Sequence, residues 1–555
     1  MAALRLRNTY SRAQETFAPL ASDGSVTLYS CGPTVYSFAH IGNFRSFLLG
    51  DVLRRVLERR GHAVTHVMNI TDVGHMTEDH LADASGEDKL SKAARELGTD
   101  PFAVAAHYER AFLEDAKQLK LKEVARRPQA TRFIPEMLAM VQTLLERGFA
   151  YVDSAGQVYF EIAKFPEYGQ LSGKDVDELQ EGARVAVREE KKDPRDFALW
   201  KVDGGHLMKW DPHAAGGCWQ AEDWARLRAL VPGGVDARIG VGFPGWHIEC
   251  SAMARACLGP VIDLHTGGED NVFPHHECEI AQSYGAHGDV TPGADGGAPR
   301  KSFARTWVHC RHLLVNGRKM AKRDGTFFTV RDLLDPVASG RPELVPQLEA
   351  AGFTAGRVPA VVLRYALLSN HYGQPMNFTF ELLAAARVSL ERLQGAYDRL
   401  REAAEGAEGA AGAAGAAVLA LLDEATAGFD AALDDDLNMP VALAALFGLV
   451  RDLNALPAIG PADARAAIAR FEGLDAVLEV LDRGSRSGLI ARTRIAELAK
   501  GEGAPPADFV EELLGQRQAA KADRDFARAD ALRDELRRRG VVIEDTPTGI
   551  RWKRA

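Results

Sequence analysis

The chain has 555 residues, of which 46% are hydrophobic, so it is long and apolar enough to form three or four domains with buried cores. Its formal net charge of −10 argues against a generally basic coat for nucleic acid, so any RNA contact must come from local patches. Six cysteines are too few for a secreted disulfide scaffold of this length. With no apolar signal segment and no apolar run near the roughly 20 residues that span a bilayer, we expect a soluble, cytoplasmic protein without a membrane partner.

The first pattern along the chain is strand, turn, helix and strand. Residues 25–30 are rich in strand formers, Gly32-Pro33 interrupts them, and an apolar stripe at helical spacing runs from Ile41 to Glu58. A second strand pattern covers residues 63–70, at a distance that fits a parallel βαβ crossover. The pattern predicts a nucleotide-binding α/β unit.

The rest of the chain changes character several times. Residues 101–148 have a helical pattern, and residues 151–240 are irregular, charged and rich in Gly and Trp, which predicts an insertion between two halves of the α/β fold. A strand pattern at residues 260–265 marks the return of that fold. After about Pro359 the pattern is that of amphipathic helices, and the Ala/Gly tract at 405–415 predicts a loop between two of them.

Four residues of the metal-ligand type lie far apart in the sequence: Cys31, Cys250, His275 and Glu279. The last two are four residues apart, so a helix would put both on one face while Glu277 points elsewhere. Two sulfurs, one imidazole and one carboxylate make a plausible zinc shell.

The spacing leaves alternatives to this ligand set. His276, three residues from Glu279, and Cys278 are local rivals that spacing does not exclude. Taken without their context, Cys31 and Cys250 are more often buried small residues than ligands.

Two short motifs suit phosphate chemistry. His40-Ile41-Gly42-Asn43 stands at a helix start, where backbone amides, a close-approach glycine and an imidazole can meet phosphates. Asn43 can donate a hydrogen bond but cannot carry a proton's charge. In the second motif, Lys319 and Lys322 bring together two ammonium groups three residues apart, which suit an anionic ligand. The structural alternative for the first motif is a buried histidine at a helix start, and the alternative for the second is a basic surface turn.

These motifs, with the sequences around Cys31, Gly245–Cys250 and Phe273–Glu279, resemble the cysteinyl-tRNA synthetases of class I over nearly the whole chain. The resemblance implies an α/β fold: a Rossmann-like catalytic domain with an insertion, then a helical bundle and a small C-terminal anticodon-binding domain. It places the catalytic domain at 1–130 and 241–312, the insertion at 131–240, the lysine loop and stem-contact region at 313–357, the bundle at 358–504 and the anticodon-binding domain at 505–555.

The resemblance also implies an activity and its participants. The expected reaction is ATP-dependent activation of L-cysteine to cysteinyl-adenylate, followed by transfer to the 3′ end of tRNA(Cys). One zinc ion per chain would bind the substrate's thiolate in preference to serine, Mg²⁺ would accompany ATP, and the protein would be a monomer. Family motifs select His275 for the zinc shell, with Cys31, Cys250 and Glu279.

Further site residues follow from the resemblance. His40, Asn43, Lys319 and Lys322 are expected to be catalytic; ATP contacts are expected from His40, Gly42, Gly268, Asp270 and Lys322; amino-acid contacts are expected from Gly32, Thr71, Trp246 and His265. This chain departs from the family pattern at Asn43, where the family has histidine, and at Ala321 and Arg323, where it has serines.

The C-terminal region suggests the RNA partner. Residues 515–555 contain 11 Lys and Arg against 7 Asp and Glu, a local charge of +4, and Trp552 or Phe526 can stack on an unpaired base. The alternative is a solvated charged helix. The segment 214–240, which includes Cys218, looks longer than the family's usual link and receives no role.

Two other functions remain open from sequence. One is the related ligase that joins cysteine to an amino sugar, which is shorter and lacks the part corresponding to residues 505–555. The other is an inactive paralogue that serves as a zinc-stabilised RNA-binding module, against which the retained His40, Lys319 and Lys322 argue.

Overall fold

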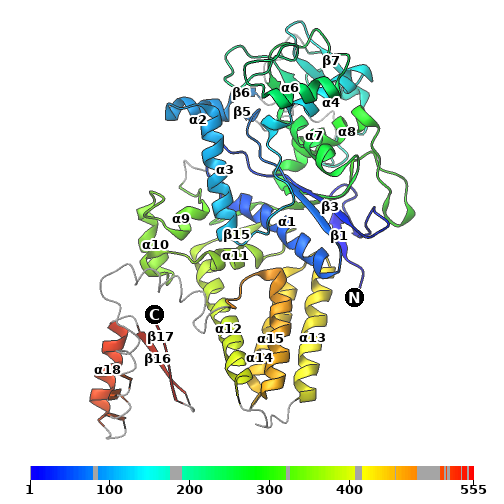
Figure 1. Ribbon diagram of the computed structural model, residues 1–555. Helices are drawn as coiled ribbons and strands as arrows, with labels where there is room; N and C mark the ends of the chain where they lie inside the picture. The colour runs from blue at the N-terminus through cyan, green and yellow to red at the C-terminus, as the bar shows by residue number, and fades with distance from the viewer. Residues whose placement is uncertain are drawn as a thin grey trace. The chain divides into compact units, whose positions relative to one another are not determined.

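The structure is a computed structural model, and it describes residues 2–78, 85–174, 191–320, 325–406, 415–456, 458–483 and short stretches between 513 and 554. The chain divides into two compact units (Figure 1): Met1–Val330 with Leu367–Thr379 and Ala427–Ala444, and Arg331–Ala366 with Phe380–Thr426 and Ala445–Ala555. Each helix in the described part of the chain is too short or too polar to span a lipid bilayer.

The first unit is built on a sheet of four parallel strands in the order β12-β11-β3-β4. Their bounds are β3 Val26–Ser30, β4 Val64–Met68, β11 Ile262–Gly268 and β12 Ala304–Cys310. Helix α1 (Ile41–Arg59) connects β3 to β4, so the predicted βαβ unit is confirmed. Because β4 and β11 lie on opposite sides of β3, the strand order reverses there, and such a switch point is where open α/β sheets bind ligands.

The apolar face of α1 fixes this helix on the sheet. Its apolar side chains are buried as the helical spacing predicts: Phe44, Phe47, Leu48, Val52, Leu53 and Val56. On the strand side, Leu28 of β3 is fully buried and pairs with Leu264 of β11 and His66 of β4. The amino end of α1 is thereby held next to the carboxyl end of β3, where the first motif lies.

The segment between the two halves of the sheet is more regular than the sequence suggests. It contains a four-stranded antiparallel sheet in the order β10-β9-β8-β7, with bounds β7 Ala150–Val152, β8 Val158–Phe160, β9 Phe197–Lys201 and β10 Phe243–Pro244. Phe160 and Phe197 stack at its centre with ring centroids 5.0 Å apart. The sequence pattern did not reveal these strands, because β8 and β9 are buried on both faces and therefore show no polar alternation.

The other elements of the first unit surround this framework. Helices α4 (Ile134–Glu146) and α6 (Ala221–Leu230) pack on each other, and α6 occupies much of the segment 214–240. The remaining described elements include β1 Arg5–Asn8, β2 Ala13–Thr16, β5 Met76–Glu78, β6 Ser85–Asp88, α2 Lys89–Leu97, α3 Pro101–Gln118, α7 Trp246–Leu258, α8 Glu277–His287, β13 Leu313–Val315, β14 Arg318–Lys319 and β15 Met376–Phe378.

The second unit is mainly helical, as predicted. Helix α12 (Phe380–Ala404) packs on α15 (Pro461–Leu478), and the fully buried Arg364 donates to the carbonyl of Leu478 at 2.6 Å. Helix α13 (Gly415–Asp434) begins after the predicted Ala/Gly loop, whose residues 407–414 lie outside the described part. Helices α11 (Ala360–Leu368), α13 and α14 (Met439–Ala455) contribute residues to both units.

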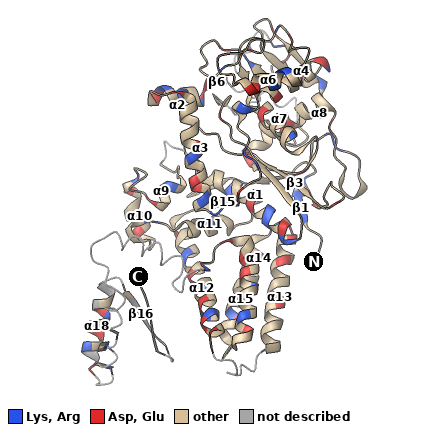
Figure 2. Cartoon of the chain, in the orientation of Figure 1, with Lys and Arg blue, Asp and Glu red and all other residues tan. Residues whose placement is uncertain are grey.

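The C-terminal segment forms a helix and a hairpin. Helix α18 (Phe526–Arg538) packs on β16 (Val541–Thr546), which pairs with β17 (Gly549–Arg554). Figure 2 shows that basic and acidic residues both occur along α18. The side chains of Phe526 and Trp552 lie outside the described part of the structure, so the predicted stacking role stays a prediction.

Candidate active site and metal centre

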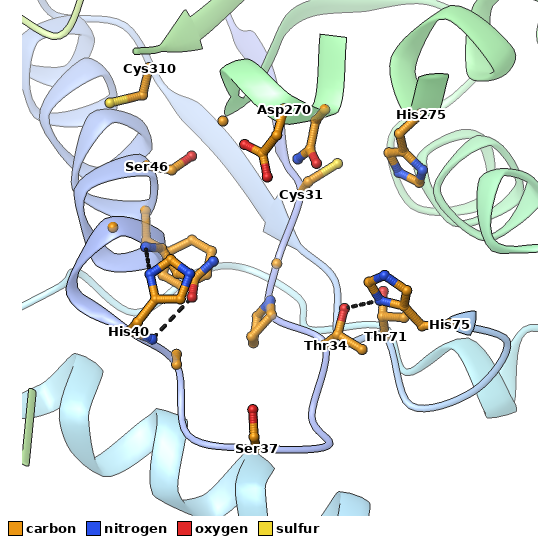
Figure 3. A pocket seen from close by; sticks show the side chains of 18 of the residues that line it. Cys31, Thr34, Ser37, His40, Ser46, Thr71, His75, Asp270, His275 and Cys310 are labelled. Atoms are coloured by element: carbon orange, nitrogen blue, oxygen red, sulfur yellow. Dashed lines mark hydrogen bonds between the residues drawn. The ribbon is translucent and has the colours of Figure 1, made fainter. Parts of the chain in front are cut away.

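A cavity of about 310 Å³ lies where the four parallel strands end (Figure 3). Cys31 and Gly32 border it directly after β3, Gly268 at the end of β11 and Cys310 at the end of β12. The amino end of α1 closes the other side with His40, Gly42 and Asn43. The cavity therefore occupies the switch point of the sheet.

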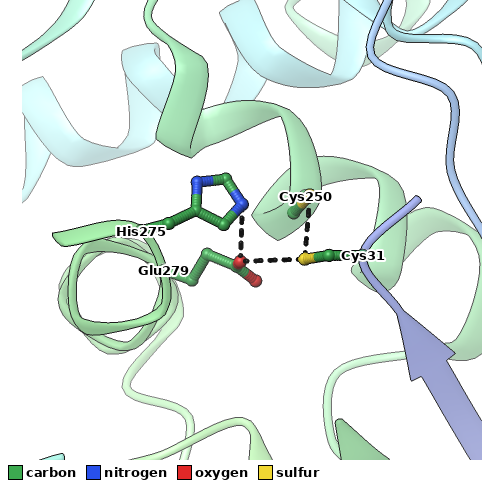
Figure 4. A group of neighbouring side chains, drawn as sticks. All are labelled: Cys31, Cys250, His275 and Glu279. Atoms are coloured by element: carbon green, nitrogen blue, oxygen red, sulfur yellow. Dashed lines mark hydrogen bonds and ion pairs between the residues drawn. The ribbon is translucent and has the colours of Figure 1, made fainter. Parts of the chain in front are cut away.

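The four predicted metal ligands meet at one edge of this cavity (Figure 4). They come from the loop after β3, from α7, from the helical turn before α8 and from α8 itself, and all are buried. The Cys31 and Cys250 sulfurs are 3.8 Å apart, His275 Nε2 is 3.1 Å from Glu279 Oε1, and that oxygen is 4.0 Å from the Cys31 sulfur.

These distances fit a tetrahedral zinc ion. Zinc–sulfur bonds of about 2.3 Å at tetrahedral angles put two sulfurs about 3.8 Å apart. The observed Cys31–Cys250 separation has this value without an ion between them, and all four ligand atoms lie within 4.8 Å of one another. The donor set of two thiolates, one imidazole and one carboxylate is also one that zinc accepts.

The protonation states favour a cation at this point. Burial acts to raise the pKa of Cys250, but the hydrogen bond from Cys31 and the charge of His275 lower it to about 6. Burial acts to raise the pKa of Glu279 too, but His265 and His275 lower it to about 2. Two anionic ligands are therefore present near neutral pH.

The other two ligands hold protons until a metal replaces them. Burial raises the pKa of the Cys31 thiol well above its usual value. Burial acts to lower the pKa of His275, but the charges of Cys250 and Glu279 raise it to about 10. In the metal-free protein near neutral pH, Cys31 is a thiol and His275 an imidazolium.

A second, overlapping set of potential ligands lies deeper in the protein. It shares Cys31 and Glu279 with the first set and adds His265 and His276. His276 Nε2 is 3.2 Å from the Cys31 sulfur, and His265 Nε2 is 3.0 Å from Glu279 Oε2. Three members of the first set line the cavity, whereas His265 and His276 do not. Of the second set, Cys31 alone borders the cavity, so the first set has more of its members at the cavity wall.

The side chains of the first phosphate motif form a reciprocal cap on α1. His40 Nδ1 accepts from the backbone N–H of Asn43 at 3.1 Å, and Asn43 Oδ1 accepts from the backbone N–H of His40 at 3.0 Å. This capping box satisfies amides that a helix start otherwise leaves unpaired. Asn43 thus has a structural task that a short polar side chain performs well.

Gly42 lies where the second phosphate motif approaches the first. A Cβ atom at this position would lie 2.6 Å from Met320 Cε, the end of a flexible side chain that can move aside, and 3.0 Å from the His40 ring, which is a tight contact. Lys319, at the end of β14, lines the cavity and is exposed. Lys322 lies outside the described residues, and its role remains a prediction.

Arg45 ties this end of α1 to the strands that carry Lys319. Its buried guanidinium donates to the carbonyls of Arg311 at 2.5 Å, His371 at 3.0 Å and Gln374 at 2.8 Å. These segments flank β13, which pairs with β14 and β15. Sequence reasoning missed Arg45, although a charged residue inside an apolar helix stripe is the signal by which it could be found.

The structure places most of the other predicted contacts at the cavity. Gly32, Thr71, Trp246, Gly268 and Asp270 line it. Gly32 is also required by close packing, because a Cβ atom there would lie 1.7 Å from the carbonyl oxygen of Asn69.

His265 has a different position. It is fully buried, its Nε2 is bonded to Glu279, and its ring stacks on Trp307. It can orient the Glu279 carboxylate from behind, and a direct substrate contact remains a prediction.

Several cavity-lining residues were not found from sequence, and His75 and Lys89 are two of them. His75 and Lys89 border the cavity near Trp246, and His75 stacks on the Trp246 ring with centroids 4.4 Å apart. His75 follows shortly after Thr71, at the carboxyl end of the β4 segment, which is the usual position of functional residues in this fold and the one signal available.

Models of known families match most of the chain. The model of the tRNA synthetases class I (C) catalytic domain matches residues 17–222 and 220–341. The DALR domain model matches residues 428–482, and the cysteinyl-tRNA ligase anticodon binding domain model matches residues 507–552.

Among solved structures, the LeuRS of Agrobacterium radiobacter in a complex titled LeuRS-tRNA-LeuAMS has a TM-score of 0.51 at 13% identity, covering 88% of this chain and 86% of its own. The Mycobacterium tuberculosis methionyl-tRNA synthetase in complex with methionyl-adenylate has a TM-score of 0.50 at 14% identity. The match covers 82% of this chain and 90% of that one. With the family models, these likenesses confirm the predicted class I synthetase fold.

Full-length relatives are more specific. The cysteine–tRNA ligase of Salinibacter ruber is 39% identical over 99% of this chain and 98% of its own length. That of Symbiobacterium thermophilum is 38% identical over all of both chains. The chain therefore belongs to the cysteine–tRNA ligase family of class I aminoacyl-tRNA synthetases.

Proposed function

We propose that the chain activates L-cysteine with ATP and transfers it to the 3′ end of tRNA(Cys). The observation that carries this proposal is that Cys31, Cys250 and His275 border the same cavity as His40 and Lys319. A site for a thiol is thus adjacent to groups that suit ATP phosphates. The matches to full-length cysteine–tRNA ligases support the same conclusion.

The proposal assigns one zinc ion per chain to Cys31, Cys250, His275 and Glu279. Cysteine and serine differ by one atom, and pocket shape separates such near-isosteres only weakly. When bound, zinc supplies a thiophilic centre for which serine's hydroxyl is a poorer ligand than cysteine's thiolate. Selection then occurs in binding, and no editing domain is required.

In the first step, the cysteine carboxylate attacks the α-phosphorus of ATP in line, and pyrophosphate leaves. His40, Gly42 and Asn43 bind phosphates at the amino end of α1, and Lys319 and Lys322 stabilise the charge that develops on the leaving group. Mg²⁺ would accompany ATP and offset the negative charge of its phosphates. The adenosine lies against Gly268 and Asp270.

In the second step, a hydroxyl of the 3′-terminal ribose of tRNA attacks the carbonyl carbon of cysteinyl-adenylate, and AMP leaves. Gly32, Thr71 and Trp246 hold the amino acid for both steps, with His265 behind Glu279. Residues 505–555 contact the anticodon stem-loop. The protein acts in the cytoplasm as a monomer.

The test is transfer of labelled cysteine to purified tRNA(Cys) with ATP, in the presence of excess serine. The proposal predicts charging that serine does not reduce. If adenylate forms but no label reaches tRNA, an amino-sugar acceptor becomes the better assignment; if neither product forms, the chain is a binding module.

A further inference from the structure

Three side chains without a role in the reaction as described form a hydrogen-bonded row at the cavity. His75 Nδ1 is 2.7 Å from the Thr34 hydroxyl, and Lys89 Nζ is 3.1 Å from His75 Nε2. All three residues line the cavity. Figure 3 shows Thr34 and His75 next to Thr71, on the side of Cys31 and His275 and away from His40.

The backbone holds this row in place. The backbone N–H of Lys89 donates to the carbonyl of His75 at 2.9 Å, where the β5–β6 pair ends. The loop of Thr34 is joined to Thr71 by hydrogen bonds from Val35 to Thr71 and from Thr71 to Pro33. The row therefore connects the loop after β3 with the first residue of α2.

The position of Lys89 is not explained by helix stability. Lys89 is the first residue of α2, and a cation in a first helical turn is opposed by the helix dipole. Its side chain reaches His75, which is buried to all but 7% and lies flat on Trp246. Trp246 in turn stacks on His275, also with centroids 4.4 Å apart.

The chemistry of the three groups fixes the direction of every hydrogen bond. An ammonium group can only donate, so His75 Nε2 accepts from Lys89 and the His75 ring proton is on Nδ1. That N–H donates to Thr34 Oγ1, so the hydroxyl hydrogen of Thr34 points to another acceptor. Among the described residues, His75 is the one hydrogen-bond partner of the Thr34 hydroxyl, and the cavity is the space beside it.

We propose that Thr34 donates a hydrogen bond to the carboxylate of the amino-acid substrate, and that Lys89 and His75 are positioning residues that keep Thr34 in the donor role. This inference rests on the proposed function and deepens it. Without Lys89, the His75 tautomer can reverse, and Thr34 can donate to His75 instead of to the substrate. The row thus favours a ligand with an anionic oxygen at this point of the cavity.

The experiment measures cysteine-dependent ATP–pyrophosphate exchange and inhibition by cysteamine, which has the thiol and amine of cysteine but no carboxylate. For Thr34→Val we expect kcat/KM for cysteine to fall about 10-fold to 100-fold, the usual effect of losing a hydrogen bond to a charged group, with an unchanged cysteamine Ki. Thr34→Ser keeps the hydroxyl group and should therefore retain the activity that Thr34→Val loses. An equal loss for cysteamine would overturn the proposal, because Thr34 would then not act on the carboxylate.

The positioning role is tested by a double-mutant cycle. Lys89→Met should lower kcat/KM for cysteine about 10-fold, but should have little further effect in a Thr34→Val background. Lys89→Arg should recover part of the activity. Lys92→Met is the matched control, since Lys92 is exposed on the same helix, and it should behave like the original protein.

Several results would contradict the positioning role. They are full activity of Lys89→Met, a loss of the same size with and without Thr34, and a loss in proportion to zinc content. If Lys89→Met does not fold, Lys89→Gln takes its place in the cycle. Absence of cysteine-dependent exchange in the unsubstituted protein would refute the proposed function itself, so the two failures are distinct.

Discussion

The amino-acid side and the phosphate side of the cavity are built in different ways. On the amino-acid side, Cys31, Cys250, His275 and Glu279 are buried, come from three separate chain segments and already stand at ligand distances. On the phosphate side, the first motif is a capped helix end and Lys319 is exposed on a short strand pair.

This difference follows from the task of each side. Discrimination between sulfur and oxygen needs ligands whose positions do not adapt, and burial within packed elements fixes them. ATP phosphates need charge and backbone amides, which an exposed lysine segment and a helix end can supply. Gly42, which admits Met320 within contact distance of α1, is where the two phosphate motifs meet.

The largest effect is expected from Cys250→Ser. Loss of a ligand should cost more than the roughly 10-fold to 100-fold that partners outside the metal shell cost, so zinc and cysteine activation should disappear together. Zinc analysis and pyrophosphate exchange measure the two quantities. Cys257→Ser is the matched control, because Cys257 lies on the same helix and outside the ligand set. A Cys250→Ser variant with full zinc occupancy would disprove the ligand assignment.

Lys322→Ala tests the phosphate side. Removing a cation that stabilises the leaving pyrophosphate should lower the rate of adenylate formation about 10²-fold to 10³-fold. Zinc content and tRNA binding should not change, because neither depends on this side of the cavity. Lys117→Ala serves as the control, since Lys117 is exposed and does not line the cavity. Unchanged ATP turnover in Lys322→Ala would remove Lys322 from the mechanism.

The pH dependence of zinc uptake tests the amino-acid side. Because the pKa of Cys31 is raised well above its usual value and that of His275 to about 10, both are protonated between pH 7 and 9. Cys250, with a pKa of about 6, and Glu279, with one of about 2, have lost their protons there. Zinc should displace about two protons, so its affinity should rise about 100-fold per pH unit, as measured by competition with a chelator. A slope near zero would contradict these protonation states.

The smallest effect concerns the capping box on α1. Asn43→Ala removes the acceptor for the backbone N–H of His40 and should lower the free energy of unfolding by about 1 kcal/mol. Denaturant unfolding measures this change. Asn43→Asp keeps the accepting oxygen and should preserve stability, but its negative charge should weaken ATP binding. Equal stability of all three proteins would show that the cap does not matter.

The sequence predicted the parts of the site that depend on short-range geometry. The four-residue spacing of His275 and Glu279 is enough to place both on one face, and the strand before Cys31 is plain from its composition. The choice of His275 over His276 came from the family motif. On a helix, His276 three residues before Glu279 and His275 four residues before it are both neighbours of Glu279, so spacing does not separate them. The structure indeed brings His276 within 3.8 Å of Glu279.

Other features depend on tertiary contacts that no local pattern reports. The short strands β7 to β10 are recognisable through their pairing, and His75 and Lys89 meet because β5 and β6 pair. The Asn43 cap illustrates a third case. In the sequence, Asn43 is a departure from the family's histidine, which puts its role at the phosphates in doubt. In the structure, Asn43 forms reciprocal hydrogen bonds with His40.

The most direct test of the central claim is X-ray absorption spectroscopy at the zinc edge, with and without cysteine. The account predicts two sulfur, one nitrogen and one oxygen ligand in the resting protein, and an additional sulfur when cysteine binds, with no change when serine is added. A resting shell with one sulfur and two nitrogens would place the ion among Cys31, His265, His276 and Glu279. That shell, or one that cysteine leaves unchanged, would contradict selection of the substrate by its thiolate.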